Sequence, residues 1–242
     1  MSSAKFSHLK MVAFLSLVIE LSFGEVCSAQ DIDFVEVRDE PQHRHRFENE
    51  YVRVYDVLLP LGYVTLYHRH SENTIYTVVH PSTLNSLTTE GVKGANTLRR
   101  GSVSFSPQRD HPIIHQVRNV GDTVARLIGV ELRGIGRVTD EPPITAHGYT
   151  KEFDNNFVRV SRLTLDPDES TGEHTIEFPT VAIAVRDAIL TRDSTDGSSL
   201  TQTIEAAHVL FRDKGVTQRI RNTGDTPLEF VIYELLSTHE NP

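Results

Sequence analysis

Two stretches of the sequence occur twice, in the same order. The segment FENEYVRV at 47–54 returns as FDNNFVRV at 153–160, and VRNVGDT at 117–123 returns as IRNTGDT at 220–226. The two offsets, 106 and 103 residues, are nearly equal. Because a repeat of this length has the size of a small folded unit, the sequence predicts two tandem copies of one domain.

Each copy is expected to consist of short strands. Its runs of Val, Ile, Leu, Thr and Tyr are broken by turn sequences such as PLG, TTEG, RRG, NVGD, DSTDG and NTGD, and almost nothing has the period of a helix. This pattern predicts an all-β sandwich or barrel. We place the copies at 44–136 and 150–237, with 137–149 and its proline pair as the linker.

The charge balance argues against a nucleic-acid partner. The chain has 24 Lys and Arg against 33 Asp and Glu, a net charge of -9, and no basic run of five or more. Binding to phosphate backbones requires clustered cations. We therefore expect a small-molecule substrate, and homo-oligomer formation stays open.

The first 29 residues resemble a secretory signal peptide. Lys5 and Lys10 precede the apolar run MVAFLSLVIELSF, and the small residues of CSA allow cleavage after Ala29. The alternative is an N-terminal membrane anchor, for which the apolar run is short. Cleavage removes Cys27, the single cysteine, and leaves histidine and carboxylate as the metal ligands. We expect a secreted or periplasmic protein with no membrane segment in its mature form.

Two histidines end a strand-like segment in the first copy. In GYVTLYHRH, Val64 and Leu66 share a parity with His68 and His70. Alternate residues of a strand point to the same face, so both imidazoles are expected to point inward with the apolar side chains. A third histidine, His115, falls on another predicted strand. Three neutral imidazoles from neighbouring strands can bind one divalent ion and leave other positions open.

These histidines give the chain a resemblance to the bicupins. The first cupin motif has a glycine, five residues and His-x-His, and the second has a glycine, five residues, a proline, and later a histidine four residues before an asparagine. The matching residues are Gly62, His68 and His70 in the first motif and Gly101, Pro107, His115 and Asn119 in the second. The resemblance implies two tandem cupin-type jelly-roll β-barrels, with a metal bound in the first.

The first copy departs from the cupin pattern at one ligand. Where the family has a metal-binding glutamate, this sequence has Thr74 or Ile75, and Glu72 is the candidate for a displaced carboxylate ligand. Tyr76 has inward parity and a hydroxyl that could donate to a substrate, which makes it the candidate catalytic residue. Of the other histidines, His111 is a weaker loop candidate, and several, such as His43, His45 and His80, belong to no pattern.

The second copy lacks most of these residues. At the repeat offsets His174 matches His68, but His70 becomes Ile176 and His115 becomes Gln218. The framework therefore does not need histidine at these positions, and a chemical role explains the first copy better than packing does. The second copy is expected to be a metal-free, degenerate cupin.

The resemblance implies a metal-dependent cupin whose ion is Fe, Mn, Zn, Cu or Ni. Three-histidine centres without the glutamate are similar to those of cupin dioxygenases. We therefore expect a dioxygenase-like oxidoreductase that acts on a small organic acid or enol. The alternatives are a metal-dependent isomerase or lyase on a sugar or small acid, and a non-catalytic binding module.

Overall fold

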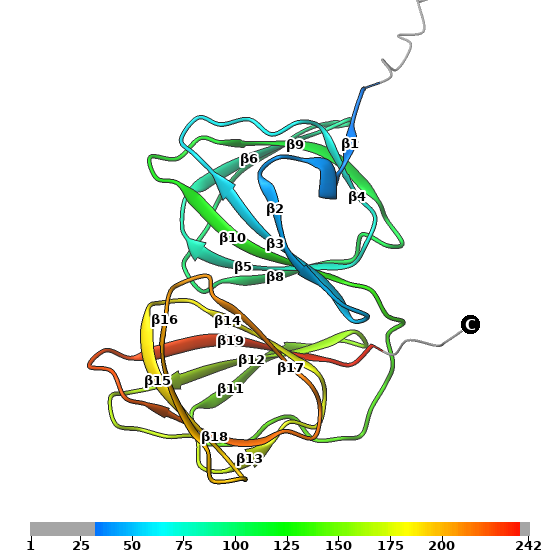
Figure 1. Ribbon diagram of the computed structural model, residues 1–242. Helices are drawn as coiled ribbons and strands as arrows, with labels where there is room; N and C mark the ends of the chain where they lie inside the picture. Colours follow the sequence, from blue (N-terminus) through cyan, green and yellow to red (C-terminus); the bar gives the residue numbers. More distant parts are fainter. Residues whose placement is uncertain (1–31, 238–242) are drawn as a thin grey trace, which may run out of the picture. The chain divides into compact units, whose positions relative to one another are not determined.

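The computed structural model describes residues 32–237, and these form two β-barrels (Figure 1). The first barrel consists of β1 (Val35–Glu36), the short 3₁₀ helix η1 (Val37–Asp39), β2 (His43–Glu48), β3 (Val52–Leu59), β4 (His68–His70), β5 (Thr74–His80), β6 (Thr83–Thr88), β7 (Gly91–Thr97), β8 (Val103–Ser106), β9 (Ile113–Asn119) and β10 (Ala125–Leu132).

The second barrel repeats this order of strands. It consists of β11 (Tyr149–Asp154), β12 (Val158–Leu165), β13 (His174–Thr175), β14 (Thr180–Ala184), β15 (Ala188–Ser194), β16 (Ser199–Ile204), β17 (Val209–Arg212), β18 (Thr217–Asn222) and β19 (Leu228–Leu235). The sheets β2-β3-β10-β5-β8 and β4-β9-β6-β7 of the first barrel match β11-β12-β19-β14-β17 and β13-β18-β15-β16 of the second. The predicted all-β fold of two tandem jelly-roll barrels is confirmed.

The first barrel has one addition at its N-terminal end. Strand β1 pairs in parallel with β4, so that Val35 lies beside His68. The chain then passes through η1 into β2. This extra segment borders the interior surface that carries the first barrel's histidines.

The repeated Asn-x-Gly-Asp turns have the same hydrogen bonds in both barrels. Asn119 donates from Nδ2 to the carbonyls of Leu59, at 2.9 Å, and Thr123, at 2.8 Å. Asn222 donates in the same way to Leu165 and Thr226, at 2.9 Å each. Both asparagines are fully buried. Because a buried amide must find partners, the conserved spacing of the repeat has a structural cause.

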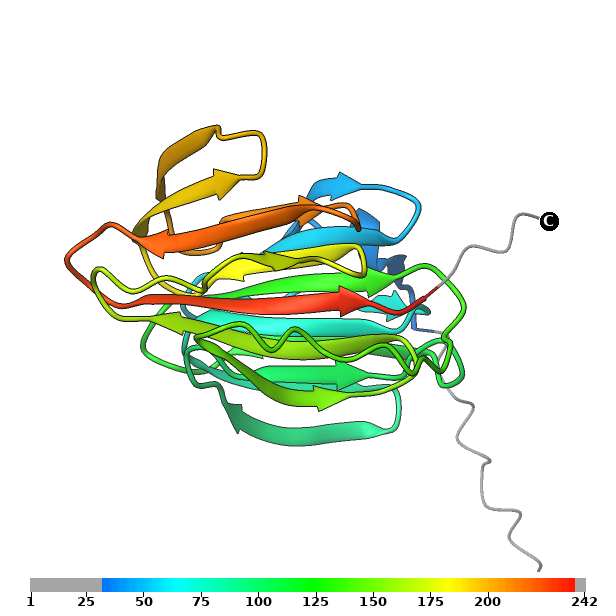
Figure 2. The ribbon, with the colours of Figure 1, turned by 90° about the horizontal axis from the view of Figure 1, so that it is seen from below.

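The two barrels pack through their long-strand sheets, whose layers are visible from below in Figure 2. One apolar core spans both sheets. Its fully buried members include Val54, Ile75 and Val130 from the first barrel and Val160, Val181 and Val231 from the second. Polar contacts cross the same boundary: the Thr77 and Tyr233 hydroxyls are hydrogen-bonded, Arg162 Nη2 donates to the Gly101 carbonyl at 2.6 Å, and Arg100 Nη1 donates to the Val185 carbonyl at 3.3 Å.

Each barrel also has an interior of its own. Side chains such as Val57, Val78 and Leu127 line the inside of the first barrel, and Leu163, Leu190 and Phe230 line that of the second. The candidate sites lie in these interiors. The predicted signal peptide at 1–29 lies outside the described residues. Within 32–237 no helix is long and apolar enough to cross a membrane.

Candidate metal centre

The three predicted histidines meet inside the first barrel. His68 and His115 are direct partners in the ladder between β4 and β9. Their ring centroids lie 4.6 Å apart, and the His115 ring lies 5.1 Å from that of His70. The His68 and His70 side chains are almost completely buried. The structure therefore brings His115 together with two histidines that lie 47 and 45 positions before it in the sequence.

The reason that the sequence suggested for their inward direction was wrong. Val64 and Leu66 are exposed, and Thr65 is buried. The regular strand starts only at His68, because Thr65 is already tied to Val117 by its backbone N–H, at 2.9 Å, and by its hydroxyl, at 2.8 Å. The alternation is therefore interrupted between Thr65 and His68, and the histidines point inward with Thr65.

A fourth histidine, His43 on β2, completes the cluster. One ring nitrogen each of His43, His68 and His70 lies within 4.8 Å of the others, and the His43 ring centroid is 4.7 Å from that of His68. Two ligands at the usual zinc–nitrogen distance from one ion are at most about 4 Å apart. The bound of 4.8 Å for His43, His68 and His70 is somewhat wider than that limit, so a bound ion would draw the rings slightly together.

Sequence reasoning missed His43 because it lies in no motif. The repeat offset of 106 pairs it with Tyr149 in the second copy, so the framework does not need histidine there either. The replacement of His43 by Tyr149 in the second copy is the sequence feature that could have identified His43 as a site residue. It resembles the changes from His70 to Ile176 and from His115 to Gln218, which did indicate a site.

The Nδ1 atoms of three of the imidazoles contact partners behind the site. His68 Nδ1 donates to the Leu66 carbonyl at 2.8 Å, and His43 Nδ1 donates to the buried Glu40 carboxylate at 2.8 Å. His115 Nδ1 is 2.9 Å from the Ser86 hydroxyl. Such contacts fix the tautomer and orient the ring so that Nε2 is available to a metal.

Two of the Nε2 atoms have no partner in the described part of the chain. His68 Nε2 and His115 Nε2 are buried and make no hydrogen bond. A buried polar atom without a partner is costly. A divalent ion between the four rings would satisfy both atoms, so the residues present fit a metal.

The protonation states also suit metal binding. Burial lowers the pKa of His68 to about 4 and that of His115 to about 3, with the neighbouring rings adding to both effects. Burial, and then the His115 and His68 rings, lower the pKa of His70 well below its usual value. Burial alone would raise the pKa of Glu40, but hydrogen bonds from His43 and the Gln42 backbone hold it below its usual value. At neutral pH the imidazoles of His68, His70 and His115 are therefore neutral, beside the ionised Glu40 carboxylate.

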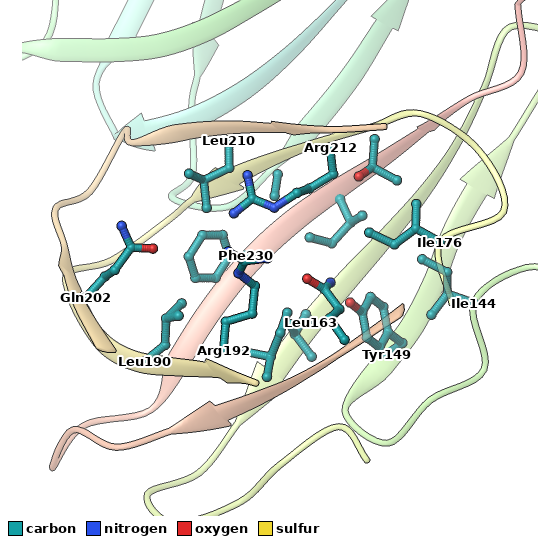
Figure 3. A pocket seen from close by; sticks show the side chains of 15 residues that line it. Ile144, Tyr149, Leu163, Ile176, Leu190, Arg192, Gln202, Leu210, Arg212 and Phe230 are labelled. Atoms are coloured by element: carbon teal, nitrogen blue, oxygen red, sulfur yellow. The ribbon is translucent and has the colours of Figure 1, made fainter. Parts of the chain in front are cut away.

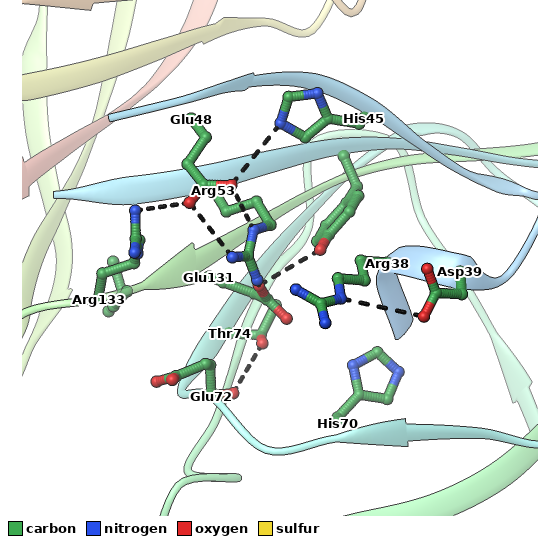
Figure 4. Close-up of polar contacts among 12 residues, drawn as sticks. Arg38, Asp39, His45, Glu48, Arg53, His70, Glu72, Thr74, Glu131 and Arg133 are labelled. Atoms are coloured by element: carbon green, nitrogen blue, oxygen red, sulfur yellow. Dashed lines mark hydrogen bonds and ion pairs between the residues drawn. The ribbon is translucent and has the colours of Figure 1, made fainter. Parts of the chain in front are cut away.

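Glu72 does not lie with the histidines. Its Oε2 accepts hydrogen bonds from Arg109 Nε at 3.0 Å and Arg109 Nη2 at 2.7 Å. Figure 4 shows the Glu72 carboxylate directed away from the His70 ring. The expectation that Glu72 replaces the family glutamate is corrected here, because its charge is already paired. Glu40, acting through His43, is the buried carboxylate at the site.

Tyr76 lies at the edge of the cluster. Its hydroxyl is 3.4 Å from His70 Nδ1, and burial, together with the Glu131 carboxylate, raises its pKa. Tyr76 and the four histidines line a cavity of about 410 Å³. His111 is exposed on its loop and is not among the residues that line this cavity.

The rest of the cavity wall is mostly apolar, with one cation. Leu59, Val78 and Leu127 contribute buried apolar surface. Arg99 is exposed and also lines the cavity, which places it where the cavity meets solvent. Its guanidinium forms no ion pair with any residue in the described range. The cavity therefore combines a metal-type donor set, a hydroxyl, apolar walls and a free positive charge.

The second barrel has a different set at the matching positions. His174 pairs with Gln218 in the ladder that matches the pair of His68 and His115. The Tyr149 hydroxyl is 3.3 Å from His174 Nε2, where the first barrel has two adjacent histidine rings. Among the described residues the metal-type cluster is confined to the first barrel.

No family model matches the sequence, and no curated protein matches it. Solved structures do. AerE from Microcystis aeruginosa has 10% identity, a TM-score of 0.53, and coverage of 82% of this chain and 99% of AerE. A variant of the oxalate decarboxylase OxdC from Bacillus subtilis has 11% identity, a TM-score of 0.55, and coverage of 81% and 76%. Bacillus subtilis oxalate decarboxylase from a study of its Mn(II) centres has 12% identity, a TM-score of 0.53, and coverage of 85% and 77%. At these identities the likeness shows the fold.

Fold and site together define a tandem jelly-roll protein with a candidate divalent-metal centre in its first barrel. Both histidine motifs of the cupin pattern converge on that centre, and the second barrel has lost them. The chain has the tandem jelly-roll fold of the bicupin oxalate decarboxylase, and within the described residues the metal-type cluster lies in its N-terminal barrel.

Proposed function

We propose that this bicupin is an exported, metal-dependent oxidoreductase of the dioxygenase type, acting on a small organic acid or enol. The observation that carries the proposal is the cluster of four imidazoles at a cavity of about 410 Å³, in which the Nε2 atoms of His68 and His115 are buried without a partner. A purely structural ion is usually enclosed by its ligands, whereas catalytic ions keep access to substrate. The apolar wall suits a small organic body.

His43, His68, His70 and His115 would hold the ion. When bound, a divalent ion of this kind supplies Lewis-acid chemistry and, if it is redox-active, electron transfer to and from oxygen. Imidazole ligands carry no negative charge to offset that of the ion. The carboxylate that would offset part of it is Glu40, which accepts a hydrogen bond from His43 Nδ1. An anionic, chelating substrate would offset that charge.

Two further side chains would orient the substrate. Tyr76 would donate a hydrogen bond from its hydroxyl to a substrate oxygen, because the hydroxyl lies at the cavity edge beside His70. Arg99 would pair with a substrate carboxylate at the cavity mouth. Such a charge-assisted pair fixes orientation as well as adding affinity. Leu59, Val78 and Leu127 would keep water away from the organic part of the substrate.

A lyase is the second candidate. Bacillus subtilis oxalate decarboxylase, whose Mn(II) centres are named in one of the matching structures, shares the fold and acts on a small acid without being a dioxygenase. The four imidazoles and Arg99 suit either reaction class. The two candidates differ in their need for oxygen and in which metals support turnover.

The test loads purified, chelator-treated protein with Fe(II), Mn(II) or Zn(II) and measures oxygen uptake with a panel of 2-hydroxy acids and enolisable diketones. We expect uptake with a redox-active ion and an inactive zinc form. The double variant His70→Ile, His115→Gln introduces the side chains of the second barrel and should abolish turnover. Arg99→Met should raise KM for acidic substrates more than it lowers kcat.

Anaerobic turnover by the zinc form would replace the oxidoreductase with the lyase or isomerase. Ligand binding without turnover under any metal would leave a binding module. His208→Gln, at an exposed position in the second barrel, is the matched control for the histidine changes and should behave as wild type.

A further inference from the structure

The second barrel encloses a cavity that the proposed reaction does not use. It has a volume of about 50 Å³, several times the roughly 10–15 Å³ that one enclosed water requires. Most of the residues that line it are apolar, among them Leu163, Leu190 and Phe230. Two of the others are arginines (Figure 3).

Arg192 on β15 and Arg212 on β17 reach into this cavity from different strands. Figure 3 shows both guanidinium groups directed toward its centre, beside the Phe230 ring. Burial lowers the pKa of Arg212, and the charge of Arg192 adds to that effect. The two cations are therefore close enough to repel each other.

Neither guanidinium forms an ion pair within the described residues, although the charge of Arg192 contributes to lowering the pKa of the exposed Asp196 carboxyl, which does not line the cavity. The Arg192 Nε atom is buried and makes no hydrogen bond within the described residues, and Arg212 Nη1 donates only to the adjacent Phe211 carbonyl, at 2.9 Å. None of the residues that line the cavity is acidic. Both arginines are half-buried. Charges that are partly withdrawn from water without a counter-charge are unfavourable, so two of them in one cavity indicate a missing anion.

The barrel framework does not require the first of these arginines. Arg192 pairs with Ile220 in its ladder, and Ser86 pairs with Val117 in the first barrel. Ile220 and Val117 are equivalent repeat positions, so Arg192 replaces the serine that orients His115. Ser86 orients a histidine of the metal centre in the first barrel, and the equivalent residue of the second barrel, Arg192, is a cation.

The second arginine also replaces a serine. Arg212 pairs with Thr180, and Ser106 pairs with Thr74, the residue equivalent to Thr180. Since small hydroxyl side chains suffice at both positions in the first barrel, packing does not explain two long cations in the second.

We propose that the second barrel binds a short-chain monocarboxylate, with its carboxylate between Arg192 and Arg212 and its aliphatic part against Leu163, Leu190 and Phe230. Guanidinium groups match the planar carboxylate and bind it through paired N–H donors. The apolar lining favours a hydrocarbon tail, and the volume limits the ligand to a few carbon atoms. This site is independent of the metal and of the reaction in the first barrel.

The test uses isothermal titration of the full, chelator-treated chain with butyrate, and with butyramide as the uncharged isostere. We expect saturable binding of one butyrate per chain and at least tenfold weaker binding of butyramide. Arg192→Met and Arg212→Met should each weaken butyrate binding at least tenfold. Arg219→Met removes the same charge from an exposed position on β18 and should leave the binding unchanged.

Melting temperatures provide a second readout. Without ligand, Arg192→Met should melt at or above the wild-type temperature, because an unpaired cation has been replaced by an apolar chain of similar length. Butyrate should raise the melting temperature of wild type but not of this variant. No saturable binding to folded wild type, equal binding of butyramide, or undiminished binding by Arg192→Met would each overturn the proposal. If Arg192→Met does not fold, Arg192→Lys replaces it, and wild-type affinity in that variant would contradict recognition by the guanidinium fork.

Discussion

The metal-free protein should become less stable in mild acid because of its buried histidines. The pKa of His68 is about 4 and that of His115 about 3, against 6.5 for the unperturbed side chain. Because the folded-state values are lower, the unfolded chain binds protons more readily. Stability is therefore complete above about pH 6.5 and falls as the pH approaches the folded-state values.

The size of the effect follows from the same values. Between pH 7 and pH 5, His68 costs the folded state about 2 kcal/mol and His115 about the same. Each ring's charge contributes to the other's shift, so the pair loses less than the sum, on the order of 3 kcal/mol. For a chain of this length, that lowers the melting temperature by about 6–12 °C.

The assay compares thermal melts of chelator-treated wild type and His115→Gln at pH 7 and pH 5. Gln218 occupies the same position in the second barrel, so glutamine fits the framework there. We expect the variant to lose about half of the pH effect, while acidic groups common to both proteins cancel in the difference. His208→Gln is the exposed control. An equal loss of stability in wild type and His115→Gln would refute the reasoning.

Metal analysis at neutral pH should find one divalent ion per chain. The ion should leave only as the pH falls to about 4, the pKa of His68, because protonated imidazoles cannot ligate. An unchanged metal content in the His68→Ala, His70→Ala double variant would contradict the site. His174→Ala should leave metal content intact, and loss of the ion would mean that the second barrel takes part in binding it. Glu72→Gln should also keep the metal and destabilise the fold by at most about 1 kcal/mol, since it breaks a partly exposed ion pair; metal loss measured in that variant would restore Glu72 as a ligand. N-terminal sequencing of exported protein should begin near Gln30, and a retained N-terminal methionine would rule out cleavage.

The duplicated architecture could be predicted because it depends on local signals that occur twice. The Asn119 and Asn222 turns recur with their glycines, and the strand patterns between them recur in the same order. The ligand role of His68, His70 and His115 was predictable for a related reason. The second copy shows that Ile176 and Gln218 satisfy the same framework, so the histidines needed a different explanation.

What the sequence could not supply depends on three-dimensional register. His43 belongs to a strand of mostly charged and polar residues, HRHRFE, whose sequence suggests an exposed position. Only the pairing of β2 in the barrel places the His43 ring beside His68. Glu72 has the right parity for a ligand, but Arg109 binds it from a loop that is distant in sequence. The interruption after Thr65 depends on a bond to Val117 that no local pattern encodes.

The core between the barrels limits how this duplicated chain could diverge. Val160, Val181 and Val231 point out of the second barrel into a core that the first barrel completes, whereas the first barrel's histidines, which the second copy replaces, point inward. After duplication, mutation could therefore change the inside of one copy freely while selection kept its outer face apolar. Either barrel expressed alone would expose that face to water and tend to aggregate. The exterior of the second barrel is thus constrained by the shared core, whereas its interior is not.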